Sequence, residues 1–190
     1  MRFSKRIIGI AAFAVVVAPF AANAVAPSLS TILPRGASRG AEVDLEFHGG
    51  NLADAVDLMF HDEGIELVEL TPEDKKVRAK IKIAPDCRLG THAIRVRTKT
   101  GVTNLRLFSV GALNEIDENE EANNDPKTAP VIAINSTVNG RVTNEDADYF
   151  ALELAAGGIL SAEVEAMRLG GPLFDPKLRL ISPSGHELLA

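Results

Sequence analysis

The chain has 190 residues, of which 46% are hydrophobic and 24% are charged, with 15 Gly, 10 Pro, one Cys and no Trp. This balance is typical of a folded chain, and it excludes a collagen, a chain disordered throughout and a mini-protein held by disulfides. The formal net charge of −6 disfavours binding to nucleic acid or to an anionic membrane. The length allows one or two small domains.

The first 24 residues predict a secretory signal peptide. Residues 2–6 carry three basic side chains, residues 7–20 form an apolar run, and residues 22–24 read Ala-Asn-Ala, the small residues of a cleavage site. The apolar run is shorter than the roughly 20 residues of a spanning helix, and no later segment is long and apolar enough, so we expect no membrane span. We therefore expect an exported protein that is secreted, held at the cell surface or periplasmic.

Acidic residues concentrate in the second half of the chain. Residues 27–112 hold 12 basic and 12 acidic side chains, whereas residues 113–190 hold 5 and 14. Loss of the signal peptide removes three positive charges, so the mature chain carries a formal net charge of −9. Such a surface suits a bound cation or a basic partner, although acidity of this kind also simply keeps exported domains in solution.

Residues 25–112 predict a β-sandwich. Short runs with period-two alternation are separated by Gly, Pro, Asp and Asn clusters, and no convincing helical period lies between them. In residues 76–83, apolar side chains fall on one face and cations on the other, as in a half-buried antiparallel strand. The predicted strands span residues 41–48, 55–60, 65–70, 77–84, 92–98 and 104–110.

Residues 113–128 predict an acidic linker, because six acidic residues precede Lys127 and such a run cannot bury apolar area. Residues 129–190 predict a second all-β module. Its strand-like runs span residues 131–134, 137–142, 149–154, 159–166 and 178–181. This module looks incomplete, since it is short and stops in the apolar run 187–190, which would leave a sheet edge unpaired. We therefore expect the chain to be the N-terminal part of a longer protein.

Several short motifs in the first module follow a known pattern. Residues 27–36 read PSLSTILPRG, a proline-flanked strand with a Gly turn, and a later strand ends in Gly49-Gly50-Asn51-Leu52. The next strand carries Asp57-Leu58-Met59-Phe60. Over residues 27–111 the chain thereby resembles IPT/TIG domains, which implies an immunoglobulin-like sandwich.

Two motifs in the second half follow another pattern. Glu121-Ala122-Asn123-Asn124 is followed by VNGRV at residues 138–142 and by Asp146-Ala147-Asp148-Tyr149-Phe150. This part resembles the bacterial pre-peptidase C-terminal (PPC) domain, without that family's usual closing strands. The resemblance implies a jelly-roll-like sandwich of a type often appended to secreted peptidases and related to the collagen-binding domains of microbial collagenases.

The PPC resemblance also implies a calcium site. In the collagen-binding relatives, the linker supplies Glu and Asn ligands and the turn before Asp-Tyr-Phe supplies Asp ligands. Carried over by position, the candidate ligands are Glu121, Asn123, Asn124, Glu145 and Asp148. Clustered carboxylate and amide oxygens are what Ca²⁺ requires. The chain departs from the pattern at Asn119, where the relatives have Glu. The alternative that stays open is a solvated linker and a structural Asp that caps a turn.

The enzyme signatures that we considered do not fit. Residues 36–40 read Gly-Ala-Ser-Arg-Gly, but a nucleophile elbow needs a strand before it and a helix after it, and here a proline precedes and a strand follows. The four histidines lack the paired spacing of a zinc site. Cys87, the one cysteine, excludes an internal disulfide, and we interpret it as an incidental thiol.

The sequence therefore predicts a non-catalytic exported binding, adhesion or accessory module, with no cofactor other than a candidate Ca²⁺. Its partner would be an extracellular protein or a cell-surface polymer. The alternative is the accessory region of a secreted peptidase or hydrolase whose catalytic domain lies beyond residue 190.

Overall fold

The computed structural model describes residues 25–118, 123–141, 147–171 and 175–189, so the predicted signal peptide lies outside the described residues. The described part is all-β, with one short 3₁₀ helix, η1 (Met167–Leu169). Within it, no helix has the length and apolarity to cross a membrane. The strands are β1 (Ser28–Leu33), β2 (Gly36–Ser38), β3 (Glu42–Gly50), β4 (Ala55–Phe60), β5 (Ile65–Pro72), β6 (Lys76–Ile83), β7 (Gly90–Thr98), β8 (Arg106–Gly111), β9 (Asn114–Asp117), β10 (Ser136–Asn139), β11 (Leu180–Ile181) and β12 (Glu187–Leu189).

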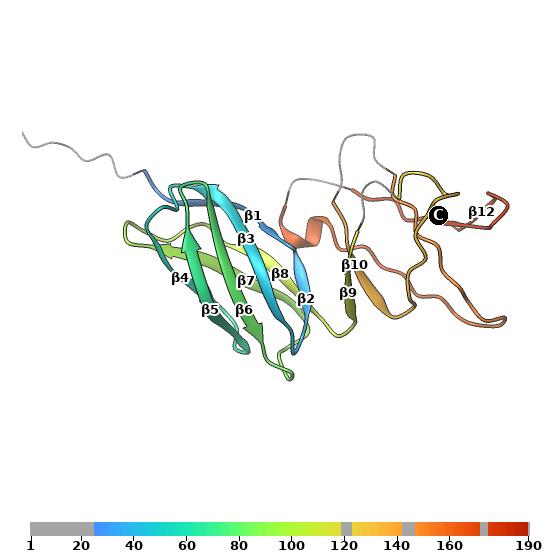
Figure 1. Ribbon diagram of the computed structural model, residues 1–190, viewed down its shortest axis with the longest axis horizontal. Helices are drawn as coiled ribbons and strands as arrows, with labels where there is room; N and C mark the ends of the chain where they lie inside the picture. The colour runs from blue at the N-terminus through green and yellow to red at the C-terminus, as the bar shows by residue number, and fades with distance from the viewer. Residues whose placement is uncertain (1–24, 119–122, 142–146, 172–174, 190) are drawn as a thin grey trace, which may run out of the picture.

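Strands β1 to β8 form two four-stranded sheets that pack face to face (Figure 1). One sheet has the order β1-β3-β6-β5, and its pairs are antiparallel. The other has the order β2-β8-β7-β4, in which β2 runs parallel to β8 and the other pairs are antiparallel. In chain order this arrangement matches the ABED and CFG sheets of immunoglobulin constant-type sandwiches, with β2 added beside the last strand. The predicted immunoglobulin-like sandwich is thereby confirmed.

Strand β6 shows why this half folds as the alternation predicts. Its buried residues are Val77, Ala79, Ile81 and Ile83. The intervening cations lie on the outer face, where Glu46 of the neighbouring β3 binds Lys76 at 2.9 Å and Arg78 at 3.4 Å. The hydrogen bond from Lys76 lowers the pKa of Glu46. The apolar face of β6 instead packs into a core that also contains Phe47, Ile94 and Phe108 from other strands.

The second half contains less strand than the sequence predicts. Its described residues form two small sheets, a parallel pair of β9 with β10 and an antiparallel pair of β11 with β12. Strand β9 lies inside the predicted acidic linker, because the backbone of residues 114–117 finds a partner in residues 136–139. The predicted strand at residues 159–166 forms no ladder with the described residues. Period-two alternation shows that a segment can form a β-strand, but a ladder of hydrogen bonds also needs a neighbouring strand.

The two halves are in direct contact beside β8. Arg35 Nη2 donates a hydrogen bond to the carbonyl oxygen of Leu169 in η1. The side chain of Leu169 is buried. Ser109 Oγ donates to Glu165 Oε2 at 2.8 Å. A Cβ at Gly171 would clash with Nη1 of Arg35, so a side chain at this position would displace the guanidinium.

The packed core predicts a clear contrast between two substitutions in the same sandwich. Phe108→Ala removes a fully buried ring and should lower the free energy of unfolding by about 3–5 kcal/mol. Val68→Ala, at an exposed β5 position, should change it by no more than about 0.5 kcal/mol. Urea unfolding followed by circular dichroism measures both values, and equal effects would contradict the described core.

Candidate functional site

Asn123 links the end of the acidic segment to the Asp-Tyr-Phe motif. Its side chain is 0% exposed. The amide nitrogen Nδ2 donates to Asp148 Oδ1 at 2.9 Å and lies 3.4 Å from Glu118 Oε2, and the backbone oxygen accepts from the Tyr149 nitrogen at 2.7 Å. The structure therefore brings together Asn123 and Asp148, two of the five predicted calcium ligands, across 25 positions of sequence.

The other predicted ligands have different outcomes. Asn124 is exposed, whereas its neighbour Asn123 is buried. Glu121 and Glu145 lie outside the described residues. Glu118 joins the cluster although the sequence analysis did not single it out, because the family pattern points to position 119. The only signal for Glu118 was its membership in the acidic run.

The cluster has oxygen donors that suit a hard cation. Asn123 Oδ1 is buried and has no hydrogen-bond partner among the described residues. A half-turn of the terminal amide group exchanges the positions of Oδ1 and Nδ2. The side chain can then present Oδ1, beside the carboxylates of Glu118 and Asp148, to a bound cation. Three oxygen-bearing side chains are fewer than the six to eight ligands of Ca²⁺, so water or the predicted ligands Glu121 and Glu145 would have to complete the set.

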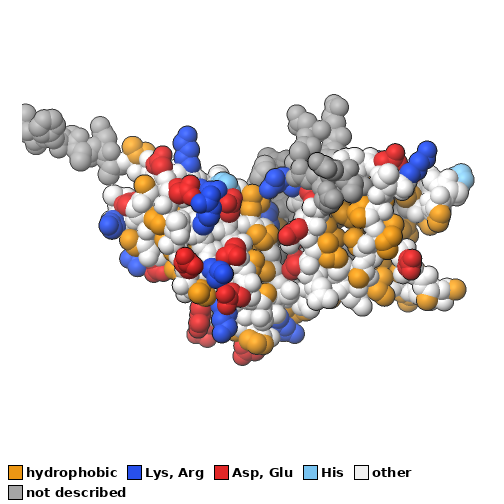
Figure 2. Space-filling view, viewed as in Figure 1, with side chains coloured by type: hydrophobic (Ala, Val, Ile, Leu, Met, Phe, Trp, Pro, Cys, Tyr) orange, Lys and Arg blue, Asp and Glu red, His pale blue; other side chains and the backbone are white. Residues whose placement is uncertain are grey.

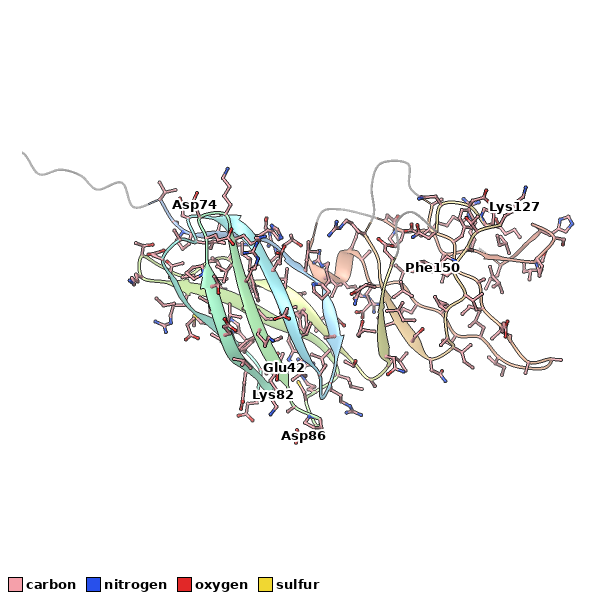
Figure 3. The ribbon with its side chains drawn as sticks, viewed as in Figure 1. Glu42, Asp74, Lys82, Asp86, Lys127 and Phe150 are labelled. Atoms are coloured by element: carbon pink, nitrogen blue, oxygen red, sulfur yellow. The ribbon has the colours of Figure 1, made fainter. Side chains whose placement is uncertain are left out.

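A second polar cluster lies at one end of the sandwich, near the turn that carries Asp86 (Figure 3). Strand β7 points the side chain of His92 inward, and this histidine is 1% exposed. Its Nε2 lies 3.9 Å from the Cys87 sulfur and 2.7 Å from the Arg88 carbonyl oxygen. Its Nδ1 lies 3.3 Å from Asp62 Oδ2. The sequence analysis considered the histidines only for the spacing of a zinc site, and it did not predict that His92 lies close to Cys87 and Asp62.

The strand pairing explains how these residues meet. Strand β4 runs antiparallel to β7, and the His61 nitrogen continues the ladder by donating to the Ala93 oxygen at 3.1 Å. Asp62 therefore reaches His92. On the other side, a Cβ at Gly64 would lie 3.0 Å from the Cys87 sulfur, and Gly64 has a φ of +92°, which favours glycine.

The chemistry of this cluster differs from that of a catalytic cysteine. A reactive cysteine is a partly exposed thiolate. Cys87 is 3% exposed, and burial raises the pKa of its thiol. The hydrogen bond from His92 Nε2 to the Arg88 carbonyl oxygen also occupies the ring nitrogen that a general base would use. Across the described residues, no three His, Cys, Asp or Glu side chains converge to hold one metal ion.

Comparison with known proteins identifies no family for the chain. No protein-family model matches the chain, and no curated protein sequence matches it. Among solved structures, the chain is similar to the filamin domain in the crystal structure of the Lin-41 filamin domain, at 12% identity and a TM-score of 0.32. The match covers 45% of this chain and 97% of that chain. A likeness this distant carries no argument about function.

The burial of Asn123 predicts that two neighbouring asparagines respond differently to the same substitution. Asn123→Asp places a third carboxylate against Glu118 and Asp148 and should destabilise this half by about 1–3 kcal/mol in calcium-free buffer. Asn124→Asp, at an exposed site, should change stability by less than about 0.5 kcal/mol. The fluorescence of Tyr149, the one tyrosine in a chain without tryptophan, reports urea unfolding beside the cluster. Equal shifts in the two variants would contradict the described contact.

Proposed function

We propose that the chain is a non-catalytic, exported binding or accessory module that forms the N-terminal part of a larger secreted protein. The observation that carries this proposal is the apolar surface of the second half. Figure 2 shows hydrophobic side chains gathered over the part that carries β9, β10 and the later elements. The most exposed include Val131, Ile134, Ile159, Leu188 and Leu189, with Ile159 97% exposed and Leu189 70% exposed.

An exposed apolar surface of this kind is typical of a site that contacts another polypeptide segment. Strands β11 and β12 form a two-stranded sheet, and an isolated pair of strands is marginal in water. Further strands of the same protein, following residue 190, would pair with such an edge and cover the apolar side chains. The folded first sandwich would then present its loops and outer sheet faces to an extracellular protein or a cell-surface polymer.

The finer family assignments are part of this proposal. The Gly-Gly-Asn motif that resembles IPT/TIG domains has a physical role in the sandwich. A Cβ at Gly49 would clash with the Ser28 backbone oxygen, and Asn51 adopts a φ of 56°. The two motifs that resemble PPC domains contact each other through Asn123 and Asp148. These observations support an IPT/TIG-like module at residues 25–112, the acidic linker at 113–128 and a PPC-like module at 129–190.

The alternative function is the accessory region of a secreted peptidase or hydrolase. It shares the exported, non-catalytic character of this chain and differs in what lies beyond residue 190. A catalytic domain there would favour the accessory role, and further binding modules would favour adhesion.

The proposal predicts the size and location of the native protein. Antibodies raised against residues 25–112 should detect it outside the cytoplasm, in a species clearly larger than the 20.2 kDa of this chain. Mass spectrometry of that species should identify peptides that follow residue 190 and so distinguish the two functions. A species of 20.2 kDa or less, or a cytoplasmic location, would contradict the proposal.

We further propose that Ca²⁺ binds at the Asn123 cluster and stiffens the acidic segment. The described residues that would hold it are Glu118, Asn123 and Asp148, and the sequence adds Glu121, Asn124 and Glu145 as candidates. The excess of acidic residues in this half favours a cation, because the ion would offset the repulsion between neighbouring carboxylates.

Calcium should therefore stabilise the second half. Calorimetric titration of the mature chain should show one binding event, and calcium at about 100 times its dissociation constant should add about 2.7 kcal/mol to stability. Asp148→Asn should weaken binding at least tenfold. Glu153→Gln, which removes a charge at an exposed position outside the cluster, should leave it within about twofold. An absence of heat and of any melting shift would contradict the calcium site without affecting the proposed module.

A further inference from the structure

Two arginines, Arg35 and Arg106, lie on the side of the first sandwich where β1 and β2 pass beside β8. Arg106, the first residue of β8, donates from Nε to the Ser30 oxygen of β1 at 2.7 Å. Arg35 connects β1 to β2, and its backbone oxygen accepts from the Ser109 nitrogen of β8 at 2.9 Å. Because β2 pairs with β8 from Gly36 onward, the strand pairing holds both arginines at the same edge of the fold.

Neither guanidinium pairs with an acidic side chain of the described residues. Arg35 Nη2 donates to the Leu169 backbone oxygen, and Arg106 Nη1 donates to the Leu105 backbone oxygen at 3.1 Å. Arg35 Nε is buried and has no hydrogen-bond partner in the described part of the chain. Three arginines elsewhere on the same sandwich do pair with carboxylates. Arg35 and Arg106 are therefore neighbouring positive charges that lack a negative partner in this structure.

The electrostatics of this edge favour a bound anion. Burial, and after it the charge of Arg106, lowers the pKa of the Arg35 guanidinium. Both causes disfavour the positive charge, and an anion beside the two guanidiniums would offset the repulsion between them. A nearby carboxylate, Glu165, is already engaged, because its Oε2 accepts from Ser109 Oγ at 2.8 Å and its Oε1 lies 3.7 Å from Arg168 Nη2.

We propose that Arg35 and Arg106 form a binding site for a small free oxyanion, of the class of sulfate, phosphate or a simple carboxylate. A guanidinium presents its N–H groups in a planar fork that matches a pair of oxygen atoms. Arg35 Nη1 and Arg106 Nη2 make no hydrogen bond to the described residues, so each arginine keeps a donor for the anion. The oxyanion would accept from both side chains and bridge them.

The surrounding charge selects a small anion over a polyanion. The site lies where η1 of the second half contacts β8, and residues 113–190 hold 5 basic and 14 acidic side chains. A polymer with many negative charges would be repelled by this half, whereas a single oxyanion meets the two guanidiniums with little added repulsion.

Binding of the anion would also strengthen the contact between the two halves. Arg35 is the residue that donates to the Leu169 oxygen of η1, which lies beside β8 (Figure 1). An anion that offsets the charge of Arg106 removes a repulsion that acts on this guanidinium. We therefore expect the second half to be held more firmly against the sandwich when the site is filled.

The test is a titration of the mature chain with sodium sulfate, phosphate and acetate, with sodium chloride keeping the ionic strength constant. The arginine Nε–H signals in NMR spectra of the ¹⁵N-labelled protein report binding. We expect the Arg35 and Arg106 signals to shift and saturate together with at least one of the three anions. Arg35→Gln and Arg106→Gln should each weaken binding at least about tenfold, as for a lost hydrogen bond to a charged group. The matched control is Arg95→Gln, which should leave the affinity within about twofold, because Arg95 Nη1 donates to the Thr103 oxygen at 2.8 Å on another strand of the same sheet.

The wild-type signals keep the test independent of how the variants fold. Absence of a saturating shift with all three anions would overturn the site, and so would binding that persists in both Arg35→Gln and Arg106→Gln. An equal loss of affinity in Arg95→Gln would also overturn it. Dextran sulfate that binds more tightly, per sulfate group, than free sulfate would show that the anion is carried on a polymer and would overturn the small-anion assignment. None of these outcomes bears on the size or location of the native protein, so the proposed function is tested separately.

Discussion

The packing of one apolar sheet face against the other is the constraint on which the rest of this structure depends. Buried side chains of β3 and β6 meet those of β7 and β8 in one shared core. Because β4 and β7 are held in register, the loop after Phe60 lies beside the turn that carries Cys87. The polar cluster at this end is therefore a consequence of core packing.

The same constraint decides which parts of the fold the sequence could predict. Period-two alternation in residues 76–83 is a local signal, and β6 follows it residue by residue because both neighbouring strands are present. Residues 159–166 alternate as well, yet they form no ladder with the described part of the chain. Local pattern says which face of a strand is apolar, whereas strand formation depends on a partner that the pattern does not name.

The same distinction between local pattern and three-dimensional arrangement applies to the candidate sites. Asn123 and Asp148 could be predicted because a family resemblance relates two distant motifs, and Glu118 was missed because its position departs by one from that pattern. The contact of His92 with Asp62 spans 30 positions and depends on the register of β4 with β7. No spacing rule links these two residues, so only the three-dimensional arrangement could reveal that the histidine faces two acceptors.

The two polar clusters differ in what they offer a cation. The Asn123 cluster has carboxylate and amide oxygens in the acidic half, where a divalent ion would relieve repulsion between carboxylates. The Cys87 cluster lies inside the sandwich, where His92 Nε2 already faces the Arg88 carbonyl oxygen at 2.7 Å and an added charge is costly. Calcium should therefore bind in the acidic half and leave Cys87 unaffected.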